Sequence, residues 1–181
     1  LITGGGTGIG LAIARDLAAQ GALVTITGRR QEVLDSVAGE NITGMAMDVR
    51  DEDDVVAKIA SAVAERGPVQ ICIPNAGIAE GKAVHKTDMA FWRNMMATNL
   101  DGAFLTIRES LKSMRDTDWG RVVAISSMAG LRGLPGAAAY SASKHGMIGL
   151  IRSLAEDYMG QPYTFNAICP GYVDTPIVTR N

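Results

Sequence analysis

Tyr140 and Lys144 stand four residues apart in a segment of helical pattern, so both side chains emerge from one face of the expected helix. A phenol in water ionises at about pH 10, and a neighbouring ammonium group stabilises its ionised form. Ser127 lies at the end of an apolar run typical of a buried strand, where its hydroxyl could bond a carbonyl oxygen. The three side chains predict proton transfer to a carbonyl group that is being reduced. On spacing alone, the alternative for the Tyr–Lys pair is a solvated helix face.

A glycine-rich loop joins the first expected strand to the first expected helix. Its sequence is Thr3-Gly4-Gly5-Gly6-Thr7-Gly8-Ile9-Gly10. Glycine lets the backbone turn tightly and approach a pyrophosphate, and the following helix N-terminus offers N–H groups and a positive dipole end to that anion. We expect a dinucleotide site that includes Gly4, Thr7, Gly8, Ile9 and Gly10. The alternative is a tight turn without a ligand.

The end of the second expected strand bears on the choice between the two nicotinamide cofactors. NAD enzymes of this architecture usually place an acid about twenty residues after the loop, where it bonds the ribose hydroxyls. This chain has no acid between Asp16 and Glu32, and it carries Gly28, Arg29 and Arg30 at that strand end. A small residue followed by guanidinium groups makes room and charge for a 2′-phosphate. NADP(H) is therefore the preferred cofactor and NAD(H) the alternative. The other interpretation of Arg29 and Arg30, which we favour less, is two solvated residues at a helix start.

Short apolar runs alternate with segments of helical period, which is typical of a parallel sheet with helices on both faces. The expected fold class is α/β, a doubly wound parallel sheet of Rossmann type in three α/β/α layers. Strands are expected at residues 1–3, 23–27, 43–47, 70–74, 121–126 and 165–169, and helices at residues 8–20, 30–38, 53–66, 89–114 and 138–158, with a break near Asn99. We expect one dinucleotide-binding and catalytic domain over residues 1–181, lacking the extreme N-terminus, the substrate lid and the last strand of the natural protein.

The order of the motifs resembles that of the short-chain dehydrogenase/reductase family over residues 1–175. The motifs that carry the resemblance are the glycine loop, Asp48-Val49, Asn75-Ala76-Gly77, Asn99, the set Ser127, Tyr140 and Lys144, and Pro170-Gly171 with Thr175. Two positions depart from the family pattern. Pro74 stands where a second Asn is common, and Thr7 stands where many NADP-preferring members carry a basic residue, so the cofactor choice rests on Gly28 and Arg29.

The resemblance also implies roles for these residues. Tyr140 would be the acid/base of hydride transfer between the nicotinamide and a carbonyl carbon, Lys144 would bind the nicotinamide ribose and favour the ionised phenol, and Ser127 would orient the substrate. Asn99 would support a proton-relay water. The remaining cofactor-binding candidates are Asp48 and Val49 beside the adenine, the sheet-stabilising Asn75, Ala76 and Gly77, and Pro170, Gly171 and Thr175 beside the nicotinamide.

Composition and charge bear on the partners. The net charge is −2 and the basic residues are scattered, so we expect neither nucleic acid nor an anionic membrane surface as a partner. No apolar run reaches the roughly eighteen residues of a membrane span.

Cys72 and Cys169 have no metal-ligand spacing and suit buried free thiols in a reducing, cytoplasmic compartment. The acidic run at residues 51–54 suits a helix N-cap rather than a metal, so no metal site is expected. The resemblance implies a homo-oligomer, a dimer or tetramer, through the helices near residues 99–114 and 138–158.

The leading hypothesis is an oxidoreductase that transfers a hydride between NADP(H) and a ketone or secondary alcohol. Its substrate is expected to be a small molecule, such as a small ketone or a 3-oxoacyl or 3-hydroxyacyl thioester. Residues 128–135 would form one wall of the pocket, with Arg132 facing either an anionic substrate or solvent. The alternative function is a non-catalytic NADP-binding sensor or scaffold. A sugar-nucleotide epimerase is disfavoured by the glycine spacing.

Overall fold

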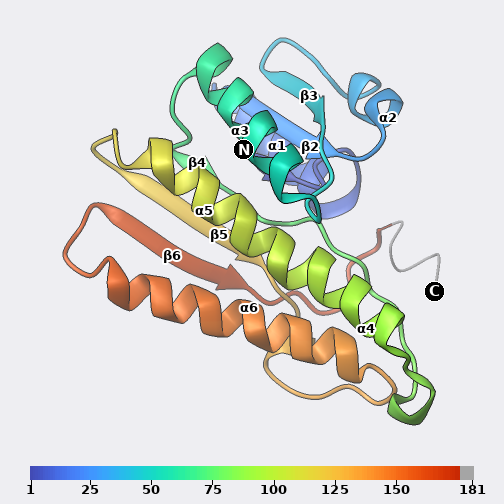
Figure 1. The fold of residues 1–181 in the computed structure, drawn as a ribbon. Helices are drawn as coiled ribbons and strands as arrows, with labels where there is room; N and C mark the ends of the chain where they lie inside the picture. The colour runs from blue at the N-terminus through green and yellow to red at the C-terminus, as the bar shows by residue number, and fades with distance from the viewer. Residues whose placement is uncertain (176–181) are drawn as a thin grey trace.

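The sheet is built from parallel strands (Figure 1). The structure is a computed structural model and describes residues 1–175. Its strands are β1 (Ile2–Thr3), β2 (Val24–Gly28), β3 (Ile42–Ala46), β4 (Ile71–Cys72), β5 (Gly120–Ile125) and β6 (Tyr163–Ile168). A parallel bridge between Ile2 and Ile73 joins the two three-stranded halves, so the strand order is β3-β2-β1-β4-β5-β6. The strand order reverses between β1 and β4, and in such sheets the ligand crevice opens at the carboxyl ends of the strands around that point.

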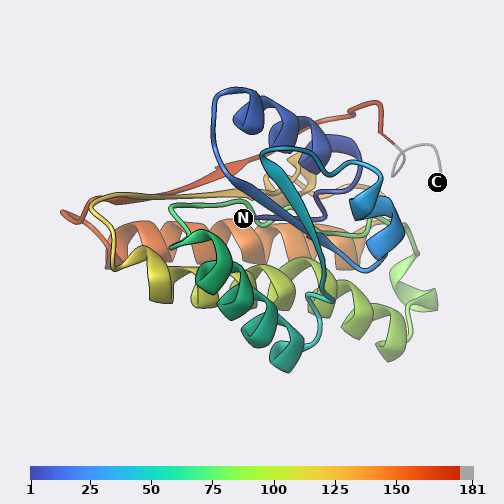
Figure 2. The ribbon, with the colours of Figure 1, turned by 90° about the horizontal axis from the view of Figure 1, so that it is seen from above.

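The helices form layers on the two faces of the sheet. They are α1 (Gly8–Ala19), α2 (Gln31–Asp35), α3 (Glu52–Arg66), α4 (Met89–Met96), α5 (Gly102–Met114) and α6 (Ala138–Asp157). Seen from above, α1 lies over one face of the sheet and α3, α5 and α6 lie along the other (Figure 2). Among residues 1–175, no helix combines the length and apolar composition that crossing a bilayer requires.

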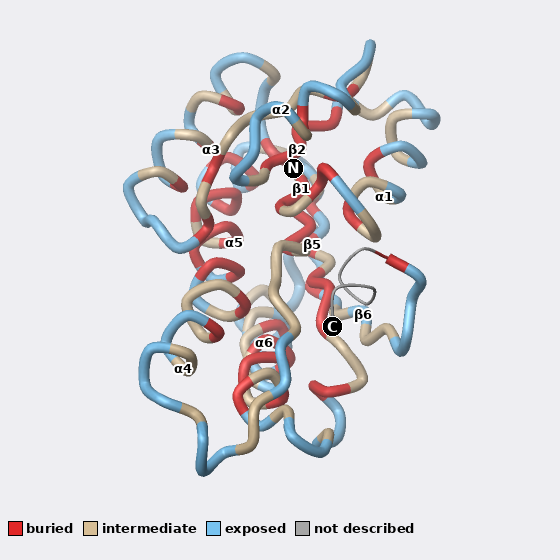
Figure 3. The backbone as a smooth tube through the Cα atoms, turned by 90° about the vertical axis from the view of Figure 1, so that its right-hand side faces the viewer, coloured by how far each residue is buried: buried red, intermediate tan, exposed pale blue. Residues whose placement is uncertain are grey.

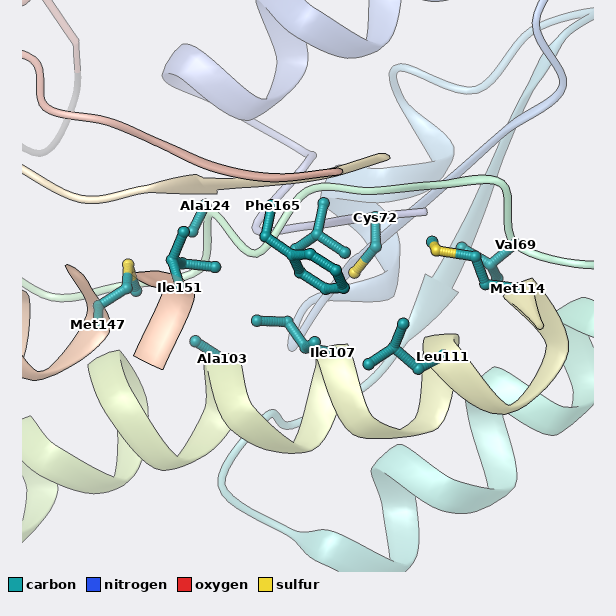
Figure 4. Close-up of a cluster of buried hydrophobic side chains, with 11 residues drawn as sticks. Val69, Cys72, Ala103, Ile107, Leu111, Met114, Ala124, Met147, Ile151 and Phe165 are labelled. Atoms are coloured by element: carbon teal, nitrogen blue, oxygen red, sulfur yellow. The ribbon is translucent and has the colours of Figure 1, made fainter. Parts of the chain in front are cut away.

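Helix α5 is the most deeply buried helix on its face of the sheet (Figure 3). One core cluster fills the space between α5, α6 and the β4–β6 half of the sheet (Figure 4), and it comprises Val69, Cys72, Ala103, Ile107, Leu111, Met114, Val122, Ala124, Met147, Ile151 and Phe165. This apolar packing fixes α6 against β5 and β6. Residues at the carboxyl end of β5 are thereby held beside the N-terminal half of α6.

The α/β fold class and the six strands are confirmed within the described residues. The helix expected at residues 30–38 is wrong in extent. Helix α2 ends at Asp35, because Ser36 Oγ bonds the carbonyl of Val33 and Gly39 then pairs with Ile42 in an antiparallel bridge. The last strand spans Tyr163–Ile168 rather than 165–169, so Cys169 lies beyond it and is only partly buried.

Two further expectations concern helix ends. The break expected near Asn99 is a π-helical turn at Ala97–Asp101, through which α4 continues into α5 without leaving the helical path. The N-cap expected in the acidic run is confirmed, because Asp51 Oδ1 accepts the N–H of Asp54 at 3.2 Å. Residues 176–181, which belong to the expected domain, lie outside the described residues.

Candidate active site

The glycine loop between β1 and α1 lies against the segment that follows β4. Gly4 and Gly8 have φ values of 64° and 55°, in the left-handed region that favours glycine. A Cβ on Gly4 would lie 2.9 Å from Ala76 Cα, and a Cβ on Gly10 would lie 2.5 Å from Asn75 Nδ2. Asn75 Nδ2 also donates to the carbonyl of Gly4 at 3.2 Å. The close approach of the two loops therefore requires glycine at both Gly4 and Gly10.

The N-terminus of α1 keeps its main-chain donors free of side-chain partners. Thr7, its N-cap residue, is exposed and makes no side-chain capping bond, and the first turn of the helix carries no acidic residue. Within residues 1–175, the first N–H groups of the helix and its positive dipole end therefore have neither a capping side chain nor an acidic residue in the first turn. This helix end suits a diphosphate.

Two cavities of about 720 Å³ and about 650 Å³ meet at the glycine loop. The first, called here the catalytic cavity, contains Tyr140 and Lys144. The second, called the adenosine-side cavity, contains Arg29 and Asp48. Both are lined by Gly4, Thr7, Ala76, Gly77, Ile78 and Glu80. A long ligand with two chemically different ends could therefore cross the loop from one cavity to the other.

Most of the site residues predicted from the sequence line these two cavities. The catalytic cavity is lined by Gly4, Thr7, Gly8, Ile9, Asn75, Ala76, Gly77, Ser127, Tyr140, Lys144, Pro170, Gly171 and Thr175. The adenosine-side cavity adds Arg29, Asp48 and Val49. Gly10 and Asn99 line neither cavity and lie behind the walls.

Lys144 is held at both ends by the carboxyl end of β5. Its Nζ donates to the carbonyl of Ile125 at 2.9 Å, and its own carbonyl accepts the hydroxyl of Ser126 at 3.1 Å. The ammonium lies 5.9 Å from the ring centroid of Tyr140. Burial of the side chain lowers the pKa of Lys144 to about 8, and the nearby Cys169 thiol opposes this shift. The site thus holds a desolvated ammonium beside a phenol.

Ser127 caps the short 3-10 helix that follows β5. Its Oγ accepts the N–H of Ala129 at 3.1 Å, which fixes the oxygen and leaves the hydroxyl hydrogen available to an acceptor in the catalytic cavity. Met128, the first residue of that 3-10 helix, donates its N–H to the carbonyl of Pro170 at 2.9 Å. The serine and the Pro170 segment are therefore attached to the same short turn.

Asn99 acts behind the cavity wall, where it is fully buried. Its Oδ1 accepts the N–H of Ile78 at 2.8 Å, and its Nδ2 donates to the carbonyl of Ile78 at 2.9 Å. Nδ2 also donates to Ser143 Oγ at 3.1 Å, and that hydroxyl donates to the carbonyl of Tyr140 at 2.7 Å. The π-helical turn is therefore linked to both the Ile78 segment and the helical turn that carries Tyr140.

Ser143 is a site residue that the sequence reasoning missed. It is fully buried and stands three residues after Tyr140, the spacing at which a helical serine hydroxyl bonds the carbonyl of the preceding turn. That spacing could have indicated the bond from Ser143 to the Tyr140 carbonyl from the sequence alone. The contact with Asn99 joins residues 44 positions apart in the chain, so no local pattern could have indicated it.

The adenosine-side cavity contains a tightly paired carboxylate. Arg50 donates to Asp48 through Nε at 3.0 Å and through Nη2 at 2.6 Å, and its Nη1 reaches Asn94 Oδ1 at 3.1 Å. Hydrogen bonding from Arg50 lowers the pKa of Asp48, while burial opposes the shift. Arg50 is a second residue that the sequence reasoning missed.

At the end of β2, the structure leaves space beside an exposed arginine. A Cβ on Gly28 would lie 3.6 Å from Leu34 Cδ2, an ordinary contact, and Gly28 has no positive φ. Arg29 follows it, is exposed, and lines the same cavity. The strand end could therefore accept a larger group beside a guanidinium.

Comparison with known proteins agrees with this geometry. The family model of the short chain dehydrogenases matches residues 1–181. The chain is 38% identical over 188 residues to granaticin polyketide synthase putative ketoacyl reductase 1 of Streptomyces violaceoruber, covering 99% of this chain and 69% of that protein. It is 40% identical over 185 residues to the cis-4-hydroxycyclohexanecarboxylate dehydrogenase of Sinomonas cyclohexanicum, covering 98% of this chain and 74% of that protein.

A solved structure extends the comparison to three dimensions. The crystal structure of a variant actinorhodin polyketide ketoreductase with NADPH superposes with a TM-score of 0.95 at 36% identity, over 99% of this chain and 72% of that one. The fold, the arrangement of the site and the family match agree with one another. The chain therefore belongs to the short-chain dehydrogenase family of oxidoreductases.

Proposed function

We propose that this protein transfers a hydride between NADP(H) and a ketone or secondary alcohol. The observation that carries the proposal is the buried ammonium of Lys144, 5.9 Å from the ring centroid of Tyr140, in a cavity that the glycine loop also lines. A dinucleotide fits the loop, because Gly4 admits no Cβ beside Ala76 and the uncapped N-terminus of α1 favours a diphosphate.

Tyr140 is the proton donor in the direction of ketone reduction. The ammonium of Lys144 favours the ionised phenol that remains once the proton has left. The hydroxyl of Ser127 donates to the carbonyl oxygen of the substrate and orients it. When bound, the reduced nicotinamide supplies the hydride. Asn99 acts on this reaction from behind the cavity, by holding the Ile78 segment and the helical turn of Tyr140.

The residues at the carboxyl end of β2 favour NADP(H) over NAD(H) as the cofactor. Gly28 provides space, Arg29 provides a cation, and the described chain places no carboxylate on β2 to bond ribose hydroxyls. Asp48, the nearby carboxylate of the adenosine-side cavity, is engaged by Arg50. A 2′-phosphate at this position would meet a guanidinium rather than a repelling charge.

A small ketone or a 3-oxoacyl thioester is the substrate class that we propose. The lining of the catalytic cavity away from the glycine loop includes the apolar residues Met128, Leu134, Pro135 and Val173. Arg132 also lines this cavity and is exposed, so it could contact an anionic group of an extended substrate. The relatives described above range from a ketoacyl reductase to a dehydrogenase of a hydroxylated cyclohexane ring, and both substrate types contain a secondary alcohol or its ketone.

We further propose one dinucleotide-binding domain that assembles as a homodimer or homotetramer in the cytoplasm. Two free cysteines suit a reducing compartment. Met89 of α4 is 56% exposed and Phe104 of α5 is 45% exposed, and such apolar side chains are typical of a helix face that pairs with a second copy. Light scattering on the full-length protein would give the mass of the assembly.

The test of the proposed reaction is the oxidation of NADPH and NADH by the full-length protein, followed by reduced-nicotinamide absorbance, with diketones, β-keto esters and acetoacetyl thioesters as substrates. Tyr140→Phe is the matched variant, because it removes one oxygen and keeps the ring. We expect turnover with NADPH that the variant loses. Cofactor binding without turnover on every substrate would favour the sensor or scaffold function instead.

A further inference from the structure

The hydroxyl of Thr27 is a buried polar group that no other described residue bonds. Thr27 is 1% exposed, and its Oγ1 has no hydrogen-bond partner among the described residues. Leaving a buried hydroxyl unpaired is unfavourable, so such groups in native proteins usually have a partner or a function. The hydroxyl therefore needs an explanation.

The neighbouring strand shows how an equivalent hydroxyl is normally satisfied. Thr3 is the partner of Thr27 in the β1–β2 register and is equally buried. Its Oγ1 accepts the N–H groups of Asn75 and Ala76 at 3.1 Å and 3.0 Å. Two threonines are thus paired near the carboxyl ends of adjacent strands. The hydroxyl of Thr3 holds the loop after β4, whereas the hydroxyl of Thr27 bonds no group within residues 1–175.

Main-chain pairing holds the backbone of Thr27 in place. Its carbonyl accepts the N–H of Gly5 at 3.1 Å, so the residue is tied to the glycine loop. The parallel pairing of β2 with β3 continues on both sides of Thr27, which lies opposite Met45. The main chain of Thr27 is thus fixed relative to the loop that would bind the diphosphate.

Thr27 lines the adenosine-side cavity together with Arg29, Asp48 and Val49. It does not line the catalytic cavity. A hydroxyl both donates and accepts, which suits a ribose hydroxyl, an adenine ring nitrogen or a phosphate oxygen. The ligand group that reaches it must therefore belong to the end of the ligand that is remote from Tyr140.

We propose that the Thr27 hydroxyl is a cofactor-binding group that hydrogen-bonds the adenosine half of the dinucleotide. This inference rests on the proposed NADP(H)-dependent function. The apoprotein keeps a buried hydroxyl unpaired, and the bound cofactor supplies its partner. Replacing the hydroxyl by a methyl group should therefore weaken cofactor binding without destabilising the apoprotein.

The experiment is Thr27→Val, which has nearly the same shape and lacks the hydroxyl. We expect the Kd of NADPH, measured by titration calorimetry, to rise about 3- to 10-fold, the effect of one neutral hydrogen bond. The melting temperature of the apoprotein should stay the same or rise by a few degrees, because no protein group loses a partner. Thr27→Ser, which keeps the hydroxyl, should restore the Kd to within about twofold of the wild type.

A matched control comes from the same strand. Thr25 lies two residues earlier on the same face of β2, is buried, and lines neither cavity, so Thr25→Val should leave the Kd unchanged. NADH and 2′,5′-ADP are the further probes. An equal loss with NADPH and NADH assigns the contact to the shared adenosine, whereas a loss confined to NADPH and 2′,5′-ADP assigns it to the 2′-phosphate.

The inference is overturned if Thr27→Val binds NADPH as the wild type does, or if its apoprotein melts at a lower temperature while Thr27→Ser fails to restore binding. The second result would mean that the hydroxyl supports the fold. Failure of the proposed function is a separate outcome, since the wild-type protein would then bind neither NADPH nor NADH, or would bind them without turnover on any substrate.

Discussion

The ammonium of Lys144 donates to the main-chain carbonyl of Ile125, the last residue of β5, at 2.9 Å. This bond crosses from the N-terminal half of α6 to the carboxyl end of the sheet, and the Ser126 hydroxyl bonds the Lys144 carbonyl beside it. The charge is held almost without solvent, with 4% of the residue exposed. A buried cation without a carboxylate partner weakens the fold, which is expected where a group serves the reaction.

Lys144→Met should remove activity and stabilise the apoprotein. At pH 7 the buried ammonium carries its full desolvation penalty, because burial lowers the pKa from 10.5 to about 8. That difference corresponds to about 3 kcal/mol, an upper bound on the gain from the substitution. Reductase activity should fall by at least about 100-fold, since the phenol loses its neighbouring cation. Urea denaturation at pH 7 and steady-state rates measure the two effects, and a variant less stable than the wild type would contradict the account.

As pH rises from about 8 to 10.5, the free energy of unfolding of the wild-type protein should increase relative to that of Lys144→Met. In that window the unfolded chain keeps the lysine proton that the folded protein has lost, so stability rises with pH. Other groups titrate in the same range, and the difference between the two proteins isolates Lys144. The measurement is the urea midpoint of both proteins at each pH. A difference that stays constant across the window would refute the lowered pKa.

Ser143→Ala should lower kcat about 5- to 10-fold, the effect of losing one positioning hydrogen bond, and should change the KM for NADPH little. The substitution leaves the Tyr140 carbonyl without its hydroxyl donor and removes one acceptor of Asn99 Nδ2. The pH dependence of kcat should shift as well, because the phenol moves relative to Lys144. Ser110→Ala is the control, since Ser110 is equally buried in α5 and lines neither cavity. Equal kinetics in both variants would show that Ser143 has no positioning role.

Local spacing made much of the site predictable from the sequence. Tyr140 and Lys144 share a helix face because they are four residues apart, and the glycine loop is one continuous segment. The six strands followed from apolar runs between turn residues. These features depend on neighbouring residues, so one sequence contains the information needed to predict them.

Contacts between distant segments were not predictable in this way. Asn99 was expected at a helix break beside the reaction, whereas it lies behind the cavity in a continuous π-helical turn and bonds Ile78, 21 residues away. The pairing of Asp48 with Arg50 depends on side-chain conformation, and the unpaired hydroxyl of Thr27 depends on what every surrounding strand provides. Each is a property of the packed structure.

Gly28→Asp should change the cofactor preference from NADPH towards NADH. The space beside Leu34 Cδ2 accepts a Cβ, so the new carboxylate can reach the ribose hydroxyls while it repels a 2′-phosphate. We expect kcat/KM with NADPH to fall at least about tenfold relative to NADH. Gly28→Ala is the control for bulk alone and should leave the preference unchanged. An unaltered NADPH:NADH ratio in Gly28→Asp would place the 2′-phosphate elsewhere and contradict the role of this strand end.

Gly4→Ala and Gly21→Ala together should separate backbone strain from the requirement for a cofactor cradle. Both glycines have positive φ, 64° and 88°, so each alanine should cost about 1 to 2 kcal/mol of unfolding free energy. Only at Gly4 does the added Cβ also meet backbone, at 2.9 Å from Ala76 Cα, whereas nothing lies within 4 Å at Gly21. Gly4→Ala should therefore be the less stable variant in urea and should bind NADPH at least about tenfold more weakly, since the glycine loop must move away from the Ala76 segment. Equal loss of affinity in both variants would mean that general destabilisation, and not the shape of the loop, governs cofactor binding.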